Sequence, residues 1–151
     1  YEILIEEGIE IDLSLFPSKR DFGGNANHVL QGPQILKTPS GSLKELPINY
    51  TIMMGQKFIY SGGGYFRLTP YWLTRYLMTS SEYTMCYFHA RDFDPGQPVL
   101  HGLTKMRKFK SYYGLNSAWS KFENLTKDFT FLNVQQASAL VDWNLVPQIN
   151  I

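Results

Sequence analysis

One histidine stands where a side chain could transfer protons. His89 follows residues 83–88 (YTMCYF), which we predict to be a buried strand because both alternating faces are apolar or weakly polar. A loop with several charges comes next, at residues 90–96. Ligands of parallel α/β folds bind at the carboxyl ends of strands, and an imidazole there could act as general acid or base. The alternative is a histidine that only packs at the strand end.

A triple glycine precedes a second group of candidate residues. Residues 62–64 could let the backbone approach a ligand closely, because glycine has no side chain. Tyr65 and Phe66 could then stack on a sugar, and Arg67 could bind an anion. The segment is not a phosphate loop, since the Lys-Ser/Thr ending is absent. The alternative is a flexible or tightly packed turn.

The remaining reactive residue types do not form a site in the sequence. His28 and His101 have no partner at a recognised metal-ligand spacing, and we expect both to be solvated. Cys86 lies inside the predicted strand and is expected to be core rather than nucleophile. As the single cysteine, it also excludes an intrachain disulfide. We therefore expect no metal bound by this chain.

Composition predicts a globular domain without a strong charge. The 151 residues are 44% hydrophobic and 18% charged, which is typical of folded proteins. Fourteen basic and 13 acidic residues give a net charge of +1, so no overall field attracts nucleic acid or a membrane surface. No apolar run reaches the ~20 residues that a membrane span needs. The sequence also shows no targeting segment, so the compartment stays open.

The first half of the chain predicts short elements and turns. Residues 1–7 and Gly8 are typical of the end of a helix whose beginning is missing, so we expect a piece of a longer protein. Residues 9–16 alternate as a strand does, and residues 18–33 are rich in Gly and Asn, as in a surface loop. A turn at Pro39-Ser40-Gly41 predicts a small β-hairpin between two apolar runs.

The second half predicts helices alternating with strands. One helix should begin at Thr69, as N-cap, and Pro70. Its predicted core face comprises Trp72, Leu73, Tyr76 and Leu77. A second helix should follow Gly114, and a strand should occupy residues 130–134. This alternation favours a parallel α/β arrangement.

Three stretches carry a resemblance to a known family. They are residues 8–17 (GIEIDLSLFP), 62–75 (GGGYFRLTPYWLTR) and 87–98 (YFHARDFDPGQP). They resemble NodB-type polysaccharide deacetylases of carbohydrate esterase family four, in the branch found with exopolysaccharide synthesis genes. The second and third stretches lie at the family's spacing, and the similarity covers nearly the whole chain.

This resemblance implies a fold, an activity and roles for particular residues. The fold would be the C-terminal part of a distorted, incomplete (β/α) barrel with a small β-hairpin insertion. The activity would be hydrolysis of N-acetyl groups on a polysaccharide, assisted by a divalent metal that is often zinc. His89 matches the histidine that protonates the departing amine, and Asp12 matches an aspartate that helps to orient it. Substrate contacts would come from five residues: Tyr65, Phe66, Arg67, Arg91 and Asp92.

The sequence also departs from the family. The metal ligands and the catalytic base precede this region in the family, so residues 1–151 are expected to be a C-terminal portion that is inactive alone. Zinc would then belong to the longer parent protein. The family's His-Pro-Trp-Glu is His89-Ala90-Arg91-Asp92 here, without the Trp of the acetyl pocket.

Two further expectations follow from these departures. The alternative function is a non-catalytic carbohydrate-binding or scaffolding module derived from the same fold. Strand edges left open by a truncated barrel predict a homodimer. Bacterial cytoplasm and periplasm are both compatible with the sequence.

Overall fold

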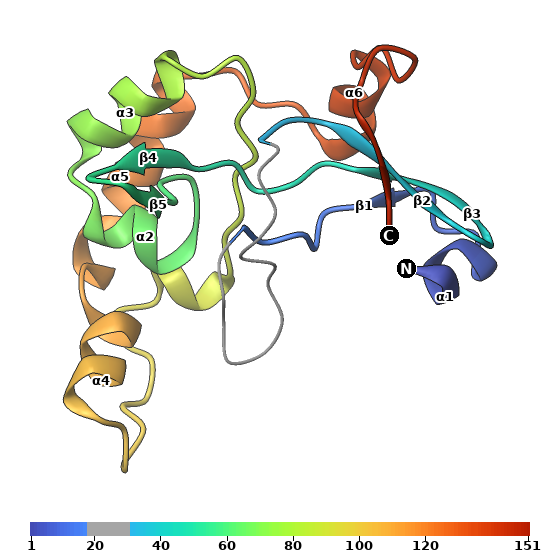
Figure 1. Ribbon diagram of the computed structural model, residues 1–151. Coiled ribbons are helices and arrows are strands. Elements are labelled where there is room, and N and C mark those ends of the chain that lie inside the picture. Colours follow the sequence, from blue (N-terminus) through green and yellow to red (C-terminus); the bar gives the residue numbers. More distant parts are fainter. Residues whose placement is uncertain (18–30) are drawn as a thin grey trace. The chain divides into compact units, whose positions relative to one another are not determined.

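A computed structural model describes residues 1–17 and 31–151 of the chain (Figure 1). The protein divides into two compact units, Tyr1–Lys57 with Leu132–Ile151 and Phe58–Phe131, and each is described by itself. His28 and most of the predicted loop at 18–33 lie outside the described residues. The predicted mixture of helices and strands is confirmed, with one mixed sheet and no closed barrel among the described strands.

The first unit is built on a four-stranded sheet. Its elements are α1 (Glu2–Glu6), β1 (Ile11–Asp12), β2 (Gln34–Thr38), β3 (Gly41–Glu45), α6 (Val134–Ala139) and β6 (Gln148–Asn150). The strand order is β1-β3-β2-β6. β2 and β3 are antiparallel and confirm the predicted hairpin, whereas β1 and β6 each join the sheet in parallel. The sheet is therefore mixed rather than purely parallel.

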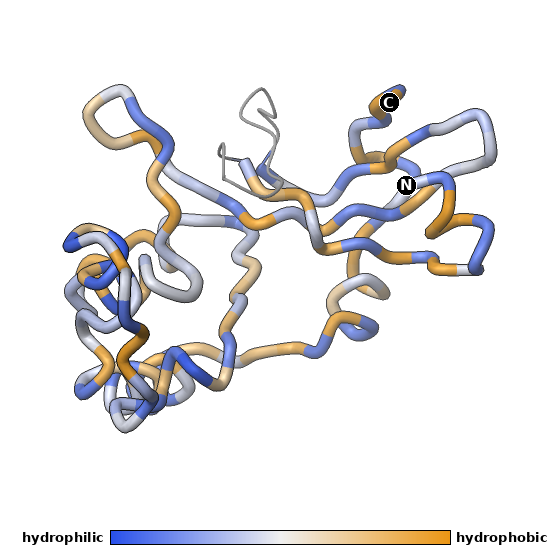
Figure 2. Tube along the Cα trace, turned by 90° about the horizontal axis from the view of Figure 1, so that it is seen from below, coloured by the Kyte–Doolittle hydropathy of each residue, from blue (hydrophilic) through white to orange (hydrophobic). Residues whose placement is uncertain are grey.

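Alternation along the hairpin creates the core of the first unit. Leu36 on β2 pairs with Leu43 on β3, and both are buried with Leu15. Figure 2 shows the change between hydrophobic and hydrophilic residues along these strands. Glu45 lies two residues beyond Leu43 and therefore points to the same, buried face of the sheet. The sheet thus places a carboxyl group among leucines.

A second hairpin was not expected from the sequence. β4 (Thr51–Met53) and β5 (Gln56–Phe58) are joined by Met54 and Gly55, both with positive φ, of 51° and 76°. Two positive φ values are typical of the type I′ turn, which Asn-Gly usually forms. Met54 takes the place of the asparagine, is fully exposed, and gave no turn signal. The hairpin was missed for this reason.

The second unit consists mainly of helices. They are α2 (Gly63–Leu68), α3 (Tyr71–Thr79), the 3-10 helix η1 (Ala90–Phe93), α4 (Lys105–Tyr112) and α5 (Leu115–Asp128). The helix predicted after Gly114 is confirmed as α5. The core contains the buried residues Tyr60, Phe66, Met78 and Leu125. Cys86 packs against this core, and burial raises the pKa of its thiol to about 12.

Two predictions about α3 are wrong. Trp72 and Tyr76, assigned to its core face, are 69% and 64% exposed, whereas Thr74 and Met78 are buried. The buried face of α3 is therefore the one that carries Thr74 and Met78, and the rings of Trp72 and Tyr76 are exposed. Thr69 does not cap α3, because its hydroxyl donates to the Tyr65 carbonyl at 2.8 Å and closes α2 instead.

Two predicted strands are also wrong. Residues 83–88 form only one isolated parallel bridge, between Gly62 and Tyr87. At residues 130–134, Asn133 instead begins α6, and its side chain accepts the Gln136 N–H at 2.9 Å. Apolar residues were available at both places, but no extended neighbour provides a full ladder of hydrogen bonds. Tertiary context therefore overrode the local pattern.

The outer strands of the sheet bear on association. Among the described residues β1 pairs with β3 alone and β6 with β2 alone, so each leaves one edge open. The homodimer stays a prediction.

No helix in the described part of the chain is long and apolar enough to cross a membrane.

Candidate functional site

Two segments of the second unit run side by side and place His89. Gly62 forms a parallel bridge with Tyr87, with Gly63 N–H donating to the Tyr87 carbonyl at 3.0 Å. In return, Tyr87 N–H donates to the Ser61 carbonyl at 3.3 Å. A Cβ atom on Gly62 would lie 2.4 Å from the Tyr87 oxygen, so this contact requires glycine. The first glycine therefore serves the packing that sets the position of His89.

His89 presents its imidazole at the end of this pair of segments. Its side chain is 56% exposed, and its backbone marks the beginning of η1. The Nε2 atom lies 2.6 Å from the Tyr87 hydroxyl, and the two rings meet edge to face. On the other side, Nδ1 lies 3.6 Å from Oδ2 of Asp92. The imidazole is thus held between a phenol and a carboxylate.

Asp92 fixes the backbone as well as the ring of His89. Its Oδ2 accepts the His89 N–H at 3.0 Å, while its own N–H donates to the His89 carbonyl at 2.9 Å. Its Oδ1 lies 3.3 Å from Nε of Arg67, and both of these side chains are almost fully buried. A carboxylate that is anchored behind a histidine restricts the orientation of the imidazole. Asp92 is therefore a positioning residue for His89.

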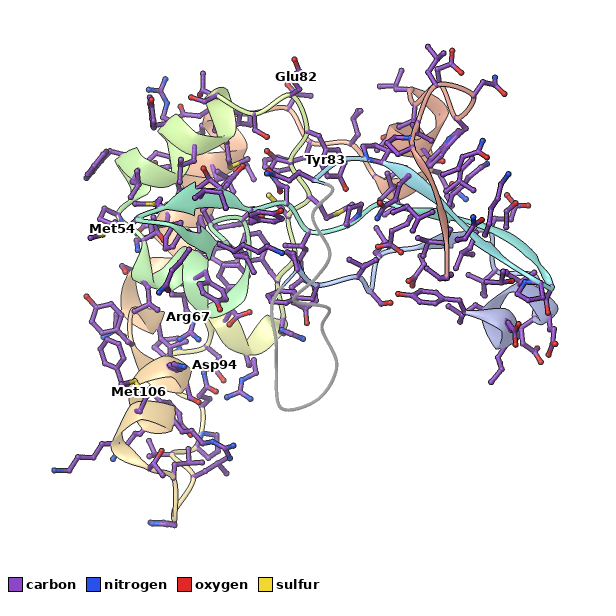
Figure 3. All side chains as sticks on the ribbon, viewed as in Figure 1. Met54, Arg67, Glu82, Tyr83, Asp94 and Met106 are labelled. Atoms are coloured by element: carbon purple, nitrogen blue, oxygen red, sulfur yellow. The ribbon has the colours of Figure 1, made fainter. Side chains whose placement is uncertain are left out.

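The guanidinium of Arg67 is held by three backbone carbonyls and by its ion pair with Asp92. Nη1 donates to the carbonyls of Ser111 and Tyr113 at 3.0 and 2.9 Å, and Nη2 donates to that of Lys110 at 3.1 Å. These carbonyls belong to the C-terminal end of α4, where a cation is favourable. Burial lowers the pKa of Arg67, and the Asp92 carboxylate opposes this change. Figure 3 shows Arg67 between α2 and α4.

The other predicted substrate contacts differ in exposure. Phe66 is 1% exposed and packs against Phe88, so a sugar could stack on it only by opening the core. Arg67 is buried likewise, and its contacts explain it without a ligand. Tyr65 is half-buried and Arg91 is exposed beside His89. These last two remain the residues of the predicted set that a ligand could reach.

Asp12 has a different set of neighbours, in the first unit. It lies opposite Glu45 across the parallel pair β1–β3, and its Oδ2 accepts the Ser14 hydroxyl at 2.6 Å. Burial raises the pKa of Glu45 to about 8, aided by the hydrogen bond and the charge of Asp12. The Leu15 N–H donates to Glu45 at 3.2 Å and opposes the shift. Asp12 thus lies beside a buried carboxyl group whose pKa is raised.

The described residues do not supply a metal centre. Within residues 1–17 and 31–151, no three His, Cys, Asp or Glu side chains gather in a way that could hold an ion. The donor set around His89 is one imidazole, one carboxylate that is paired with Arg67, and one phenol. Because the carboxylate is already paired with Arg67, this set offers fewer than the three protein ligands that a zinc site uses.

Two residues of these sites were not found from the sequence. Tyr87 lies two positions before His89, which would place both on one face of an extended segment, and this spacing was the available signal. Glu45 shares the inward phase of Leu43 on the hairpin, so its burial could have been inferred from alternation. Both were passed over because neither contact partner is visible without the fold.

The fold and the site define a mixed α/β protein whose exposed histidine is oriented by a buried aspartate–arginine pair. A family described as a domain of unknown function, DUF3473, matches residues 13–139, and the chain belongs to this family. No curated protein and no solved structure gave a match to the chain.

Proposed function

We propose that this chain supplies the general-acid part of a polysaccharide N-deacetylase. His89 would protonate the nitrogen that leaves when an N-acetyl group is hydrolysed to acetate and a free amine. The observation that carries the proposal is the arrangement of His89 itself, with an exposed imidazole and a buried carboxylate 3.6 Å behind Nδ1. A histidine oriented in this way is suited to donate a proton from its other nitrogen.

The family and the sequence motifs support this reading. DUF3473 is associated with polysaccharide deacetylase-like proteins. The segments that resemble those enzymes, residues 62–75 and 87–98, meet at the bridge between Gly62 and Tyr87. We propose that this bridge corresponds to two neighbouring parallel strands of a distorted, incomplete barrel. His89 would then lie at the carboxyl end of the second strand.

The contacts suggest how the proton would move. In the free protein, Nε2 of His89 is paired with the Tyr87 hydroxyl. A bound amide nitrogen would take the place of the phenol as the partner of Nε2, while Asp92 would keep the ring oriented. Arg67 would hold Asp92 in place through its buried ion pair. The metal and the base would have to come from a longer protein that includes this chain.

Activity of such a longer protein tests the proposal. His89→Ala should lower kcat for deacetylation of N-acetylglucosamine oligomers by roughly 10²–10⁴-fold, the usual contribution of a general acid. His101→Ala is the matched control, because this exposed histidine lies in the loop before α4. Equal rates for the two variants would contradict the proposal.

The isolated chain permits a second test, by nuclear magnetic resonance. Tyr87→Phe removes only the hydroxyl that is paired with Nε2. The Nε2 signal of His89 should shift, while the signals of His101 stay unchanged. A His89 ring that does not respond would mean that the Tyr87–His89 contact is absent in solution.

A further inference from the structure

The loop before α4 and α4 itself form a projection of unusual charge, here called the α4 projection and comprising residues 98–113. Between Asp94 and Glu123 the chain contains no acidic residue. It contains five cations there, and four of them belong to the α4 projection: Lys105, Arg107, Lys108 and Lys110. The fifth, Lys121, lies on α5 and donates to the carbonyls of Arg67 and Thr69. The net charge of +1 for the whole chain conceals this cluster, since most acidic residues lie elsewhere.

The α4 projection is also rich in exposed apolar side chains. No residue of α4 is buried. Five apolar residues of the projection are between 47% and 63% exposed: Val99, Leu100, Met106, Phe109 and Tyr113. Figure 1 shows α4 extending away from α3 and α5 of its own unit, and Figure 3 marks Met106 on it. Apolar and cationic side chains therefore share one exposed element.

Spacing gathers these apolar side chains on one side of the helix. Met106, Phe109 and Tyr113 are separated by three and four positions, which is the repeat of a helix face. The rings of Phe109 and Tyr113 lie 4.8 Å apart. The Tyr112 hydroxyl joins the loop to α4, because it accepts the Leu100 N–H at 2.9 Å and donates to the Pro98 carbonyl at 3.0 Å.

The far end of the helix is fixed as well. Three carbonyls, those of Lys110, Ser111 and Tyr113, accept hydrogen bonds from buried Arg67. The α4 projection is therefore a preformed element that needs little ordering when it binds a partner. This lowers the entropy cost of association.

We propose that the α4 projection binds the surface of an anionic lipid membrane. Helices with cations beside an exposed apolar face lie in the interface, where the apolar side chains enter the headgroup boundary and the cations meet phosphates. Three side chains of the projection are apolar without being aromatic: Val99, Leu100 and Met106. A lipid membrane would remove their surfaces from water, whereas a polar polymer would not. An acidic polysaccharide would use the cations but leave these three side chains in water.

The exposed aromatic residues of α3 provide a contrast within the same unit. Trp72 and Tyr76 are as exposed as the residues of the α4 projection. Their helix carries one cation, Arg75, which is paired with Asp128 at 2.8 Å. Because its one cation is paired, α3 offers an anionic surface less electrostatic attraction than the three lysines of α4 do. The proposal is thus specific to α4, and it does not depend on the proposed deacetylase function.

Vesicle sedimentation of the 151-residue chain tests the proposal. We expect binding to vesicles of phosphatidylcholine with phosphatidylglycerol at low salt. Affinity for pure phosphatidylcholine vesicles should be at least about tenfold weaker, because these vesicles carry no anionic headgroups. Affinity for the mixed vesicles should fall by a similar factor at high salt, because salt screens charges at a surface. Equal binding to both kinds of vesicle, or none to either, would overturn the proposal.

Variants locate the binding surface. Met106→Ser with Phe109→Ser, and Lys105→Glu with Lys108→Glu, should each weaken binding by roughly tenfold or more. Trp72→Ser with Tyr76→Ser is the matched apolar control and should bind like the unaltered chain. Circular dichroism should show that every variant is folded, since all of these side chains are exposed.

Charge alone needs its own control. Lys37→Glu with Lys127→Glu makes the same change in net charge at two exposed lysines that belong to β2 and α5. This variant should retain at least half of the binding. If it loses as much as the Lys105 and Lys108 variant, or if the α4 face binds a soluble acidic polysaccharide but no vesicles, the lipid proposal is overturned.

Discussion

The two units bury carboxyl groups in opposite ways. In the second unit, Asp92 is buried beside the guanidinium of Arg67, whose nitrogens also bind the end of α4. In the first unit, Glu45 is buried beside another carboxyl group, that of Asp12, and its pKa rises to about 8. The first arrangement keeps charge in the interior through pairing, whereas the second removes charge by protonation.

This difference separates a site that orients a group from one that responds to pH. The Arg67–Asp92 pair has a fixed geometry, which suits its contact with His89. The Glu45 carboxyl has a pKa raised to about 8 by burial and by Asp12, so its ionisation changes near neutral pH. Four predictions test this comparison, from the largest expected effect to the smallest.

Loss of the buried cation should have the largest effect. Arg67→Leu leaves Asp92 buried without its partner and the carbonyls of α4 without a donor. The free energy of unfolding should fall by about 3–5 kcal/mol, as measured by urea denaturation. Arg75→Leu is the control, because Arg75 is 60% exposed in its ion pair with Asp128 and should change stability by less than ~1 kcal/mol. Equal losses would mean that the Arg67–Asp92 pair is not buried.

The first unit should lose stability as the pH rises. The pKa of Glu45 is higher in the folded state, about 8, than its ordinary value of 4.5, so folding binds a proton. The contribution of Glu45 to the free energy of unfolding is complete below the pKa of the unfolded state. This contribution, of up to about a few kcal/mol, is lost as the pH rises from about 5 to 8.

Glu45→Gln tests the origin of this pH dependence. The amide keeps the shape of the protonated acid and cannot ionise. Urea denaturation at pH 5 and pH 8 should therefore give nearly equal unfolding free energies for this variant. A slope as steep as that of the unaltered chain would assign the pH dependence to another group.

Gly62→Ala should disturb the segment that carries His89. The added methyl group would meet the Tyr87 carbonyl, so the two backbones must separate. We expect a loss of about 1–3 kcal/mol of stability, together with a shift of the His89 resonances. Gly32→Ala is the control, since a Cβ there meets nothing within 4 Å. If both variants are equally stable, the bridge between Gly62 and Tyr87 is not rigid.

The smallest effect concerns the open edges of the sheet in the first unit. Light scattering should give a mass near twice 17.4 kDa if the predicted homodimer forms. Ile9→Lys puts a charge beside β1 and should shift the chain toward monomer by a few-fold in dissociation constant. Leu145→Lys lies outside every strand and should not. A monomer of the unaltered chain would contradict the dimer prediction.

Local patterns in the sequence determined much of the secondary structure. The turn at Pro39-Ser40-Gly41, the helix after Gly114 and the end of α1 near Gly8 were all recognisable, because turn residues and helical spacing act over a few positions. His89 was also named as the leading candidate from its place in the chain, and its catalytic role stays a prediction. These features depend on neighbours within one or two turns.

Only the tertiary structure decided which side chains are buried and which groups meet. Trp72 is exposed and Thr74 is buried, although hydrophobicity predicts the reverse. Arg67 and Asp92 are 25 positions apart in sequence, and nothing local shows that one neutralises the other. Burial and pairing depend on contacts between distant segments, so their energies become visible only once the chain has folded.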